Sequence, residues 1–277
     1  MDIQPLTDTF AAEVVERDLR VPLLDEELSR LDKAFVRHHV LVFRDQTLDK
    51  KAQLALTLQF GELDVHAALN VGADIPEVHT VSNLDSTGEP RKASLASQMW
   101  HSDKSYRSIP STATFLHAID MPPEGGDTCF ADTQSAFAAL PAKRQATLRQ
   151  LRVVHDWGRS VAKNNGGTIS EKERTDWPPI AHPLIPRHPG SGKEGIFIGQ
   201  HASHIEGMPF ADGEALIAEL LEHVTNPSFV YVHQWREGDL LMWDNRCLLH
   251  RALDNFDGDR HARILHRTVT RGTAIPA

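Results

Sequence analysis

Residues 229–251, with the sequence FVYVHQWREGDLLMWDNRCLLHR, decide the fold class of this 277-residue chain. The runs FVYV and DLLMW are rich in β-branched and aromatic residues, and polar residues with a glycine separate them, which is typical of strands joined by turns. Similar short runs recur from about residue 78 onward, among them TATFLHAID, DTCFADT, GIFIG at 195–199 and RILHRTVT. Such a series predicts a β-sandwich or barrel.

Helical patterns precede this strand series. In residues 24–38, apolar side chains recur at helical spacing with charged residues between them, which predicts an amphipathic helix. The apolar run 39–43 suits a buried strand, and a second helical stretch covers residues 48–60 and stops at Gly61. We expect this start to support the sheet rather than to form a separate domain.

Two further helical stretches interrupt the strand series, at residues 132–151, with Pro141 placed as a first-turn residue, and at residues 211–224. Residues 159–180 are polar and rich in glycine and proline, so we expect a long loop there, and loops of this length are often lids. The chain has neither an internal repeat nor a clear linker. The sequence therefore predicts one domain over residues 1–277.

The composition is that of a globular protein, with 40% hydrophobic residues, 24% charged residues and a formal net charge of −9. An acidic chain argues against a nucleic-acid partner, because phosphate binding is driven by a basic surface. No stretch approaches the roughly 18 apolar residues of a membrane span, so we expect a cytoplasmic protein with no membrane partner. Cys129 and Cys247 are too few for a disulfide framework and are expected in the core.

Sixteen histidines direct attention to metal or proton chemistry. His101 and Asp103 lie two apart in an extended run, so both side chains would point to one face of a strand. With His250 they would form the two-histidine, one-carboxylate triad of non-haem Fe(II) oxygenases. A zinc hydrolase site and a hydrogen-bonded surface pair remain alternatives. Cys247 would face away from His250 on a strand, which disfavours a thiolate ligand.

Two arginines and a threonine suggest an anion site. Arg263 and Arg267 fall on one face of the last strand, where burial is costly unless each meets an anion such as a carboxylate. The alternative is an exposed edge strand. Thr128 follows two glycines, which either make a hairpin turn or place the hydroxyl beside a bound carboxylate.

The combination of HSD at 101–103, GGDT at 125–128, WDNRCLLHR at 243–251 and the arginines Arg263 and Arg267 resembles the Fe(II)/2-oxoglutarate dioxygenases of the taurine and 2,4-dichlorophenoxyacetate dioxygenase family. The likeness covers residues 40–271. The sequence FIGQHASHIEG at 197–207 is closer to the 2,4-dichlorophenoxyacetate branch. This resemblance implies a mainly β fold with flanking helices, namely a double-stranded β-helix (a jelly roll, cupin-like).

The resemblance also implies roles for individual residues. His101, Asp103 and His250 match the iron ligands, and Thr128 and Arg263 match the positions that hold the distal carboxylate of 2-oxoglutarate. Four further positions are expected to contact substrate. Arg267 would bind the anionic group of the substrate, and His66 matches a substrate-contacting histidine of the family. His201 and His204 are expected to line the pocket. For these last two, structural roles remain an alternative. Leu69 replaces a tyrosine of the taurine site, which argues against a taurine-shaped pocket.

The predicted reaction consumes 2-oxoglutarate and O₂ at Fe(II) and hydroxylates a small anionic organic substrate. An aryloxyalkanoate would then be cleaved at its ether bond to a phenol and an oxo acid, with succinate and CO₂ as co-products. The alternatives are a taurine, alkylsulfonate or sulfate-ester dioxygenase, a zinc hydrolase, and a non-enzymatic cupin-like anion-binding protein. Assembly into a homo-oligomer is left open by the sequence.

Overall fold

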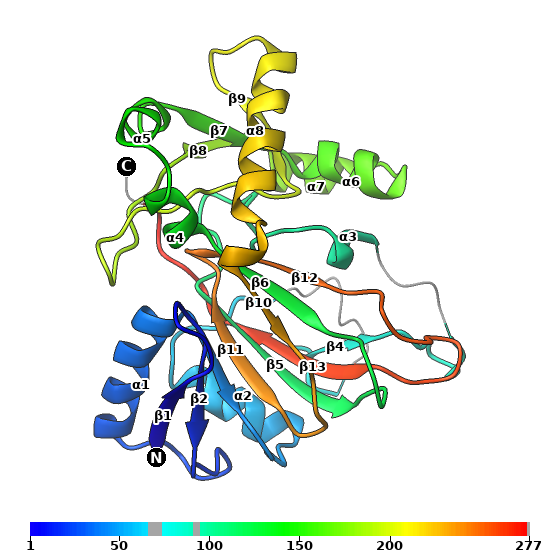
Figure 1. Cartoon of the computed structure of the whole chain (residues 1–277). Coiled ribbons are helices and arrows are strands. Elements are labelled where there is room, and N and C mark those ends of the chain that lie inside the picture. The colour runs from blue at the N-terminus through cyan, green and yellow to red at the C-terminus, as the bar shows by residue number, and fades with distance from the viewer. Residues whose placement is uncertain (66–73, 91–94, 276–277) are drawn as a thin grey trace.

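The computed structural model describes residues 1–65, 74–90 and 95–275. Within these residues the largest unit is a seven-stranded sheet, seen across the lower half of Figure 1. Its strands, in spatial order, are β1 (Asp2–Pro5), β2 (Ala12–Val15), β3 (Val40–Phe43), β11 (Leu240–Asp244), β5 (Ala113–Asp120), β13 (Ile264–Val269) and β4 (His79–Ser82). The predicted strand at 39–43 is β3, which pairs with β11 and so joins the N-terminal segment to the main sheet. The sequence did not predict β1 and β2.

A three-stranded antiparallel sheet packs on one face of the large sheet. It consists of β10 (Val230–His233), β6 (Thr128–Asp132) and β12 (Leu248–Ala252). Buried side chains of both sheets share one core, among them Leu116, Phe130, Trp243 and Leu265. Residues 229–251 thus supply β10 and β12 to the small sheet and β11 to the large one. The prediction of a mainly β fold with flanking helices is confirmed.

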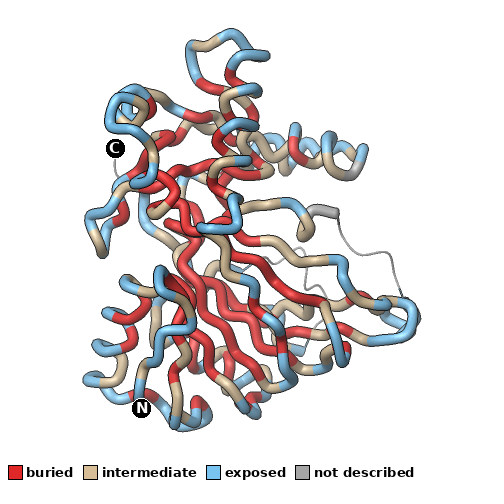
Figure 2. Tube along the Cα trace, in the orientation of Figure 1, coloured by how far each residue is buried: buried red, intermediate tan, exposed pale blue. Residues whose placement is uncertain are grey.

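Helices α1 (Asp25–His38) and α2 (Lys50–Leu58) cover the other face of the large sheet (Figure 1). Leu31 and Phe35 of α1 and Leu56 of α2 are buried against strand residues such as Phe43 and Met242. Figure 2 shows buried residues running along the central strands, with exposed positions on the outer side of α1. α1 confirms the amphipathic helix predicted at 24–38, and α2 confirms the helical stretch predicted at 48–60.

A third sheet, β8 (Ile180–Pro183), β7 (Arg152–His155) and β9 (Ala202–Ile205), lies at the other end of the molecule. Helix α8 (Phe210–Val224) packs on β9 and confirms the helix predicted at 211–224. A short 3₁₀ helix (Pro227–Phe229) leads from α8 into β10. The apolar run 195–199, predicted as a strand, belongs to no named strand, although Ile196 and Ile198 are buried in the adjoining core.

The helix predicted at 132–151 is two helices, α4 (Thr133–Ala138) and α5 (Ala142–Leu148). The break occurs at Pro141, which caps the start of α5 with a φ of −56°. Proline has no backbone N–H, so it ends one helix and begins another more readily than it continues one.

The loop predicted at 159–180 is wrong, because this segment contains helices α6 (Trp157–Asn165) and α7 (Glu171–Asp176). Each helix has a side-chain cap at its N-terminus. The Asp156 carboxylate accepts a hydrogen bond from the amide of Arg159 at 2.9 Å, and the Ser170 hydroxyl accepts one from the amide of Glu173 at 3.2 Å. Among the described residues, no helix combines the length and apolar character needed to cross a membrane.

Candidate active site

Two histidines from distant parts of the chain lie side by side at the edge of β12. The amide of His101 donates to the carbonyl of His250 at 3.0 Å, and the amide of His250 donates to the carbonyl of His101 at 2.8 Å. The two ring centroids are 4.1 Å apart. His101 lies just after the short helix α3 (Leu95–Gln98). The backbone bridge between His101 and His250 sets the spacing of the two imidazoles.

Asp103 completes a group of three ligand-capable side chains. Its Oδ1 lies 3.9 Å from Nε2 of His101 and 3.9 Å from Nε2 of His250. The expected strand alternation is wrong, because the chain turns after a single bridge at His101. Asn245 holds Ser102 and Asp103 in this turn. Its carbonyl accepts a hydrogen bond from the Ser102 hydroxyl at 2.6 Å, and its side-chain Oδ1 accepts one from the Asp103 amide at 3.3 Å.

The protonation states of the three side chains suit a metal. Nδ1 of His101 lies 2.7 Å from the carbonyl of Met99, which can only accept, so Nδ1 carries the proton and Nε2 presents a lone pair. Burial lowers the pKa of both His101 and His250, which keeps the rings neutral. Burial would raise the pKa of Asp103, but the charge of Arg267, together with smaller contributions from His250, His101 and the Thr114 hydroxyl, outweighs burial and holds this pKa well below its usual range.

Two neutral imidazoles and one carboxylate, with ligand atoms all within 4.8 Å of one another, fit a divalent first-row metal. The contact between His101 Nδ1–H and a backbone carbonyl is the kind of outer hydrogen bond that orients metal-binding histidines. We conclude that the residues present fit the iron that the sequence resemblance implies.

Thr128 and Arg263 meet at the start of β6. Nη2 of Arg263 is 3.5 Å from the Thr128 hydroxyl, and Nε of Arg263 donates to the carbonyl of Gly126 at 2.8 Å. A Cβ on Gly126, whose φ is +68°, would lie 3.1 Å from Cδ of Arg263, so this close approach requires glycine. The indole of Trp235 donates to the Thr128 hydroxyl at 3.0 Å and leaves the hydroxyl proton available for an anion.

The alternative that the last strand is an exposed edge is wrong for both arginines. β13 lies between β5 and β4, and Arg263 is buried. Arg267 is half-buried, and its Nη2 lies 2.7 Å from Oδ2 of Asp103. The structure therefore places the second arginine directly beside the candidate metal site.

The remaining predicted histidines have different surroundings. His201 is buried between Tyr106 and Trp157, with ring centroids at 4.9 and 5.5 Å, and burial lowers its pKa to about 3. His204 packs on Phe210 of α8, with ring centroids 5.2 Å apart. The predictions for His66 and Leu69 fall outside the described residues.

Lys104 is a buried cation next to the candidate metal site that sequence reasoning missed. Its Nζ lies 2.7 Å from Oδ1 of Asp64, and burial lowers its pKa to about 8. Arg107 also contacts Oδ1 of Asp64, at 3.1 Å. No local sequence pattern predicts this cluster, because Asp64 and Lys104 are forty positions apart and come together only in the folded chain.

A second group with ligand-capable atoms contains His188, Asp244 and Cys247. Its polar atoms already have partners: Nε2 of His188 is 3.0 Å from Oδ2 of Asp244, and Arg246 binds both oxygens of that carboxylate at 2.8 and 2.6 Å. Burial raises the pKa of the Cys247 thiol well above its usual range, which disfavours a thiolate. Cys247 and Cys129 are both free and buried, as expected from the sequence.

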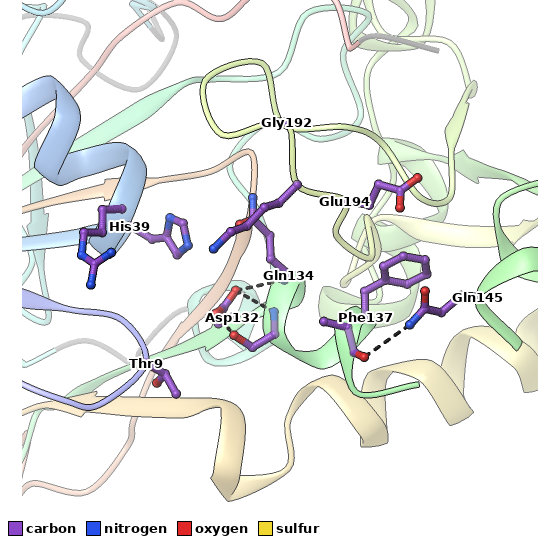
Figure 3. A pocket seen from close by; sticks show the side chains of 12 residues that line it. Thr9, His39, Asp132, Gln134, Phe137, Gln145, Gly192 and Glu194 are labelled. Carbon is purple, nitrogen blue, oxygen red and sulfur yellow. Dashed lines mark hydrogen bonds between the residues drawn. The ribbon is translucent and has the colours of Figure 1, made fainter. Parts of the chain in front are cut away.

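A polar pocket of about 370 Å³ lies at the ends of α1, β6 and α4 (Figure 3). His39, Asp132 and Gln134 are among its lining residues, together with the exposed Arg37 and Lys193. The lining includes no member of the triad. We therefore assign the chemistry to the group around His101 and not to this pocket.

Comparison with known proteins agrees with the geometry. The profile described as "Taurine catabolism dioxygenase TauD, TfdA family" matches residues 2–269. The chain is 39% identical over 284 residues to an alpha-ketoglutarate-dependent 2,4-dichlorophenoxyacetate dioxygenase of Cupriavidus pinatubonensis, covering 98% of this chain and 96% of that protein. It is 33% identical over 259 residues to an (S)-phenoxypropionate/alpha-ketoglutarate-dioxygenase of Sphingobium herbicidovorans, covering 91% and 88%.

A solved structure, described as AAD-2 in complex with Mn(II) and N-oxalylglycine, is similar over 100% of both chains, with a TM-score of 0.90 and 32% sequence identity. The match of the family profile thus extends over nearly the whole chain, and identity to relatives exceeds 30% over most of their length. On these grounds the chain belongs to the TauD, TfdA family of dioxygenases.

Proposed function

We propose that this enzyme hydroxylates an aryloxyalkanoate at the carbon next to the ether oxygen. The observation that carries the proposal is the near full-length similarity to a dioxygenase of 2,4-dichlorophenoxyacetate and to one of a phenoxypropionate. The hydroxylated product is a hemiacetal, so its C–O ether bond breaks and a phenol leaves with an oxo acid. In the balanced reaction, one oxygen atom of O₂ enters the substrate and the other enters succinate, as 2-oxoglutarate loses CO₂.

As a member of this family, the chain is a 2-oxoglutarate-dependent non-haem iron dioxygenase, and the zinc-hydrolase and non-enzymatic alternatives are not retained. Its cofactors are Fe(II), 2-oxoglutarate and O₂. We assign His101, Asp103 and His250 as the residues that would hold the iron, because their neutral imidazoles and ionised carboxylate converge. Bound Fe(II), with 2-oxoglutarate as the reductant, supplies the activation of O₂.

In this proposal the chain's own residues bind and orient the two organic acids. Arg263 would fork the distal carboxylate of 2-oxoglutarate and the Thr128 hydroxyl would donate a further hydrogen bond to it, since both are buried and 3.5 Å apart. Arg267 would bind the substrate carboxylate, because its guanidinium reaches the triad. Burial around the site excludes water and strengthens both contacts.

The proposal also covers the type of β fold and the role of the segment 159–180. We infer that the two facing sheets form the double-stranded β-helix that the family resemblance implies. We also propose that the segment 159–180, which contains α7 and most of α6, is a lid over the substrate.

The reaction is tested by incubating the purified protein with Fe(II), 2-oxoglutarate and O₂, and adding 2,4-dichlorophenoxyacetate, taurine or no substrate. We expect the phenoxyacetate to stimulate succinate formation and to release one phenol per succinate. Taurine should leave succinate at the level of the sample without substrate. Stimulation by taurine alone would contradict the aryloxyalkanoate assignment while leaving the enzyme class intact.

A further inference from the structure

The two oxygens of Asp103 have different surroundings. Oδ1 faces Nε2 of both histidines at 3.9 Å and accepts no hydrogen bond from Thr114 or Arg267. Oδ2 accepts the hydroxyl proton of Thr114 and lies 2.7 Å from Nη2 of Arg267. A carboxylate whose second oxygen is already occupied offers one oxygen to a metal, so the surroundings of Asp103 favour binding through Oδ1 alone.

The direction of the Thr114 hydroxyl is set by Asn245. Nδ2 of Asn245 donates to Oγ1 of Thr114 at 2.9 Å. Because a hydroxyl has a single proton and Asn245 fills an acceptor position, that proton is directed to Oδ2 of Asp103. Thr114 and Asn245 are 0% and 1% exposed, so water does not compete for these contacts.

Asn245 also joins the two chain segments that carry the triad. Its side-chain Oδ1 accepts from the Asp103 amide at 3.3 Å and from the Trp243 indole at 3.2 Å. Its backbone amide donates to the carbonyl of Thr112 at 2.9 Å. Asn245 lies in the turn between β11 and β12, five positions before His250. The same residue therefore holds the backbone at Asp103 and the turn that leads to His250.

We propose that Asn245 and Thr114 are positioning residues that hold Asp103 as a single-oxygen ligand and preform the metal site before metal binds. The proposal rests on the assignment of His101, Asp103 and His250 as the iron ligands. Hydrogen bonds of this outer kind contribute 10- to 100-fold to metal affinity in other sites, as an order of magnitude. Their effect here operates through Asp103, since neither residue is assigned as a ligand.

The test measures Mn(II) affinity by electron paramagnetic resonance without 2-oxoglutarate or substrate. Thr114→Val keeps the side-chain shape and removes the hydroxyl, and we expect it to weaken Mn(II) binding about 10- to 100-fold. Thr114→Ser keeps the hydroxyl and should retain nearly wild-type affinity. Thr57→Val is the matched control, because Thr57 is also 0% exposed and its hydroxyl bonds to Gln53 and Thr268 away from the triad.

A spectroscopic measurement separates positioning from a general loss of stability. The absorption of bound Co(II) follows ligand number and geometry, so it should change in Thr114→Val, where Oδ2 has lost a donor, and stay unchanged in Thr57→Val. If Thr114→Val does not fold, Asn245→Ser serves the same comparison, with weaker Mn(II) binding expected again.

Wild-type Mn(II) affinity and an unchanged Co(II) spectrum in folded Thr114→Val would overturn the positioning role alone. A wild-type protein that binds no Mn(II), or a His250→Ala variant that binds it as tightly as wild type, would instead overturn the ligand assignment. The two failures are therefore distinguishable, and neither measurement depends on which substrate the enzyme oxidises.

Discussion

Arg263 limits what the candidate site can bind. The side chain is 8% exposed, and its Nε is tied to the Gly126 carbonyl at 2.8 Å, which fixes the plane of the guanidinium. Burial lowers its pKa to about 10, although Asp127 opposes this, so Arg263 remains charged at neutral pH. A buried cation of this kind is strongly stabilised by a bidentate anion.

Replacing Arg263 tests its role with 2-oxoglutarate. We expect Arg263→Ala to raise the KM for 2-oxoglutarate about 30-fold or more, because losing one partner of a buried charged pair costs about 2–5 kcal/mol. The KM for the aryloxyalkanoate should change far less. Succinate formation at varied concentrations of each acid measures both constants. Arg260→Ala is the control, since the Arg260 side chain is 80% exposed.

Arg267→Ala is the matched comparison and should show the reverse pattern, with the larger rise in the KM for the aryloxyalkanoate. Equal rises for both acids in Arg263→Ala would contradict the division of labour between the two arginines. The arginines are four positions apart, yet one meets Gly126 and the other Asp103.

At the level of elements, α6 and α7 are attached to the turn that follows Asp103. The ring of Tyr106 lies 4.6 Å from that of Trp157 in α6 and 5.6 Å from that of Trp177 at the end of α7. The guanidinium of Arg107 lies 5.2 Å from the Trp177 ring. Short helices gain little stability from their own hydrogen bonds, so this aromatic contact helps to hold the pair in place.

Removing one ring should therefore loosen these helices and spare the sheets. We expect Trp177→Ala to increase amide hydrogen exchange in residues 157–177 by about 2- to 10-fold, since an aromatic pair contributes about 0.5–1.5 kcal/mol beyond its buried area. Exchange in β5 and β11 should stay as in the wild type. Arg174→Ala, on an exposed part of α7, is the control. Faster exchange throughout the sheets would show instead that Trp177 supports the whole fold.

The elements also show where local sequence suffices. α1 is predicted because its apolar side chains recur at helical spacing with charged residues between them, which is a local signal. Helices α6 and α7 were missed because a polar, glycine-containing composition is shared by loops and by short exposed helices. Their caps at Asp156 and Ser170 were the available signal.

For the whole molecule, buried histidines predict the response to acid. Burial lowers the pKa of His155 well below its usual range and that of His201 to about 3, against an ordinary value of 6.5. Below pH 6.5 these histidines bind protons in the unfolded chain but stay neutral in the folded protein. The free energy of unfolding therefore falls as the pH drops from 6.5 toward 3. Above pH 6.5 these groups contribute their full stability.

His201 alone should account for about 2 kcal/mol of the free energy of unfolding lost between pH 7 and pH 5. Urea unfolding of the metal-free protein at both pH values measures this loss. In His201→Gln the difference between the two pH values should shrink by that amount, whereas the exposed His261→Gln should leave it unchanged. An undiminished pH dependence in His201→Gln would show that this ring is not the buried neutral base described above.

The sequence by itself determined the mainly β class and the helices α1, α2 and α8, and it supplied the proposal that His101, Asp103 and His250 hold the iron. These depend on periodicity and residue type, which are local properties, or on motifs that match a family. The three residues proposed as iron ligands do lie together, although a strand was expected where the chain turns after His101.

Tertiary structure alone decided the surroundings of those residues. The Asp103 amide donates to Asn245 and the Thr114 hydroxyl donates to the Asp103 carboxylate, so these hydrogen bonds link β5, the turn before β12 and the segment after α3. The contact between Lys104 and Asp64 likewise joins residues forty positions apart. Hydrogen bonds and ion pairs act over about 3 Å of space regardless of separation along the chain, so no local pattern encodes them. They exist only once the sheets have packed and excluded the water that would otherwise satisfy the same groups.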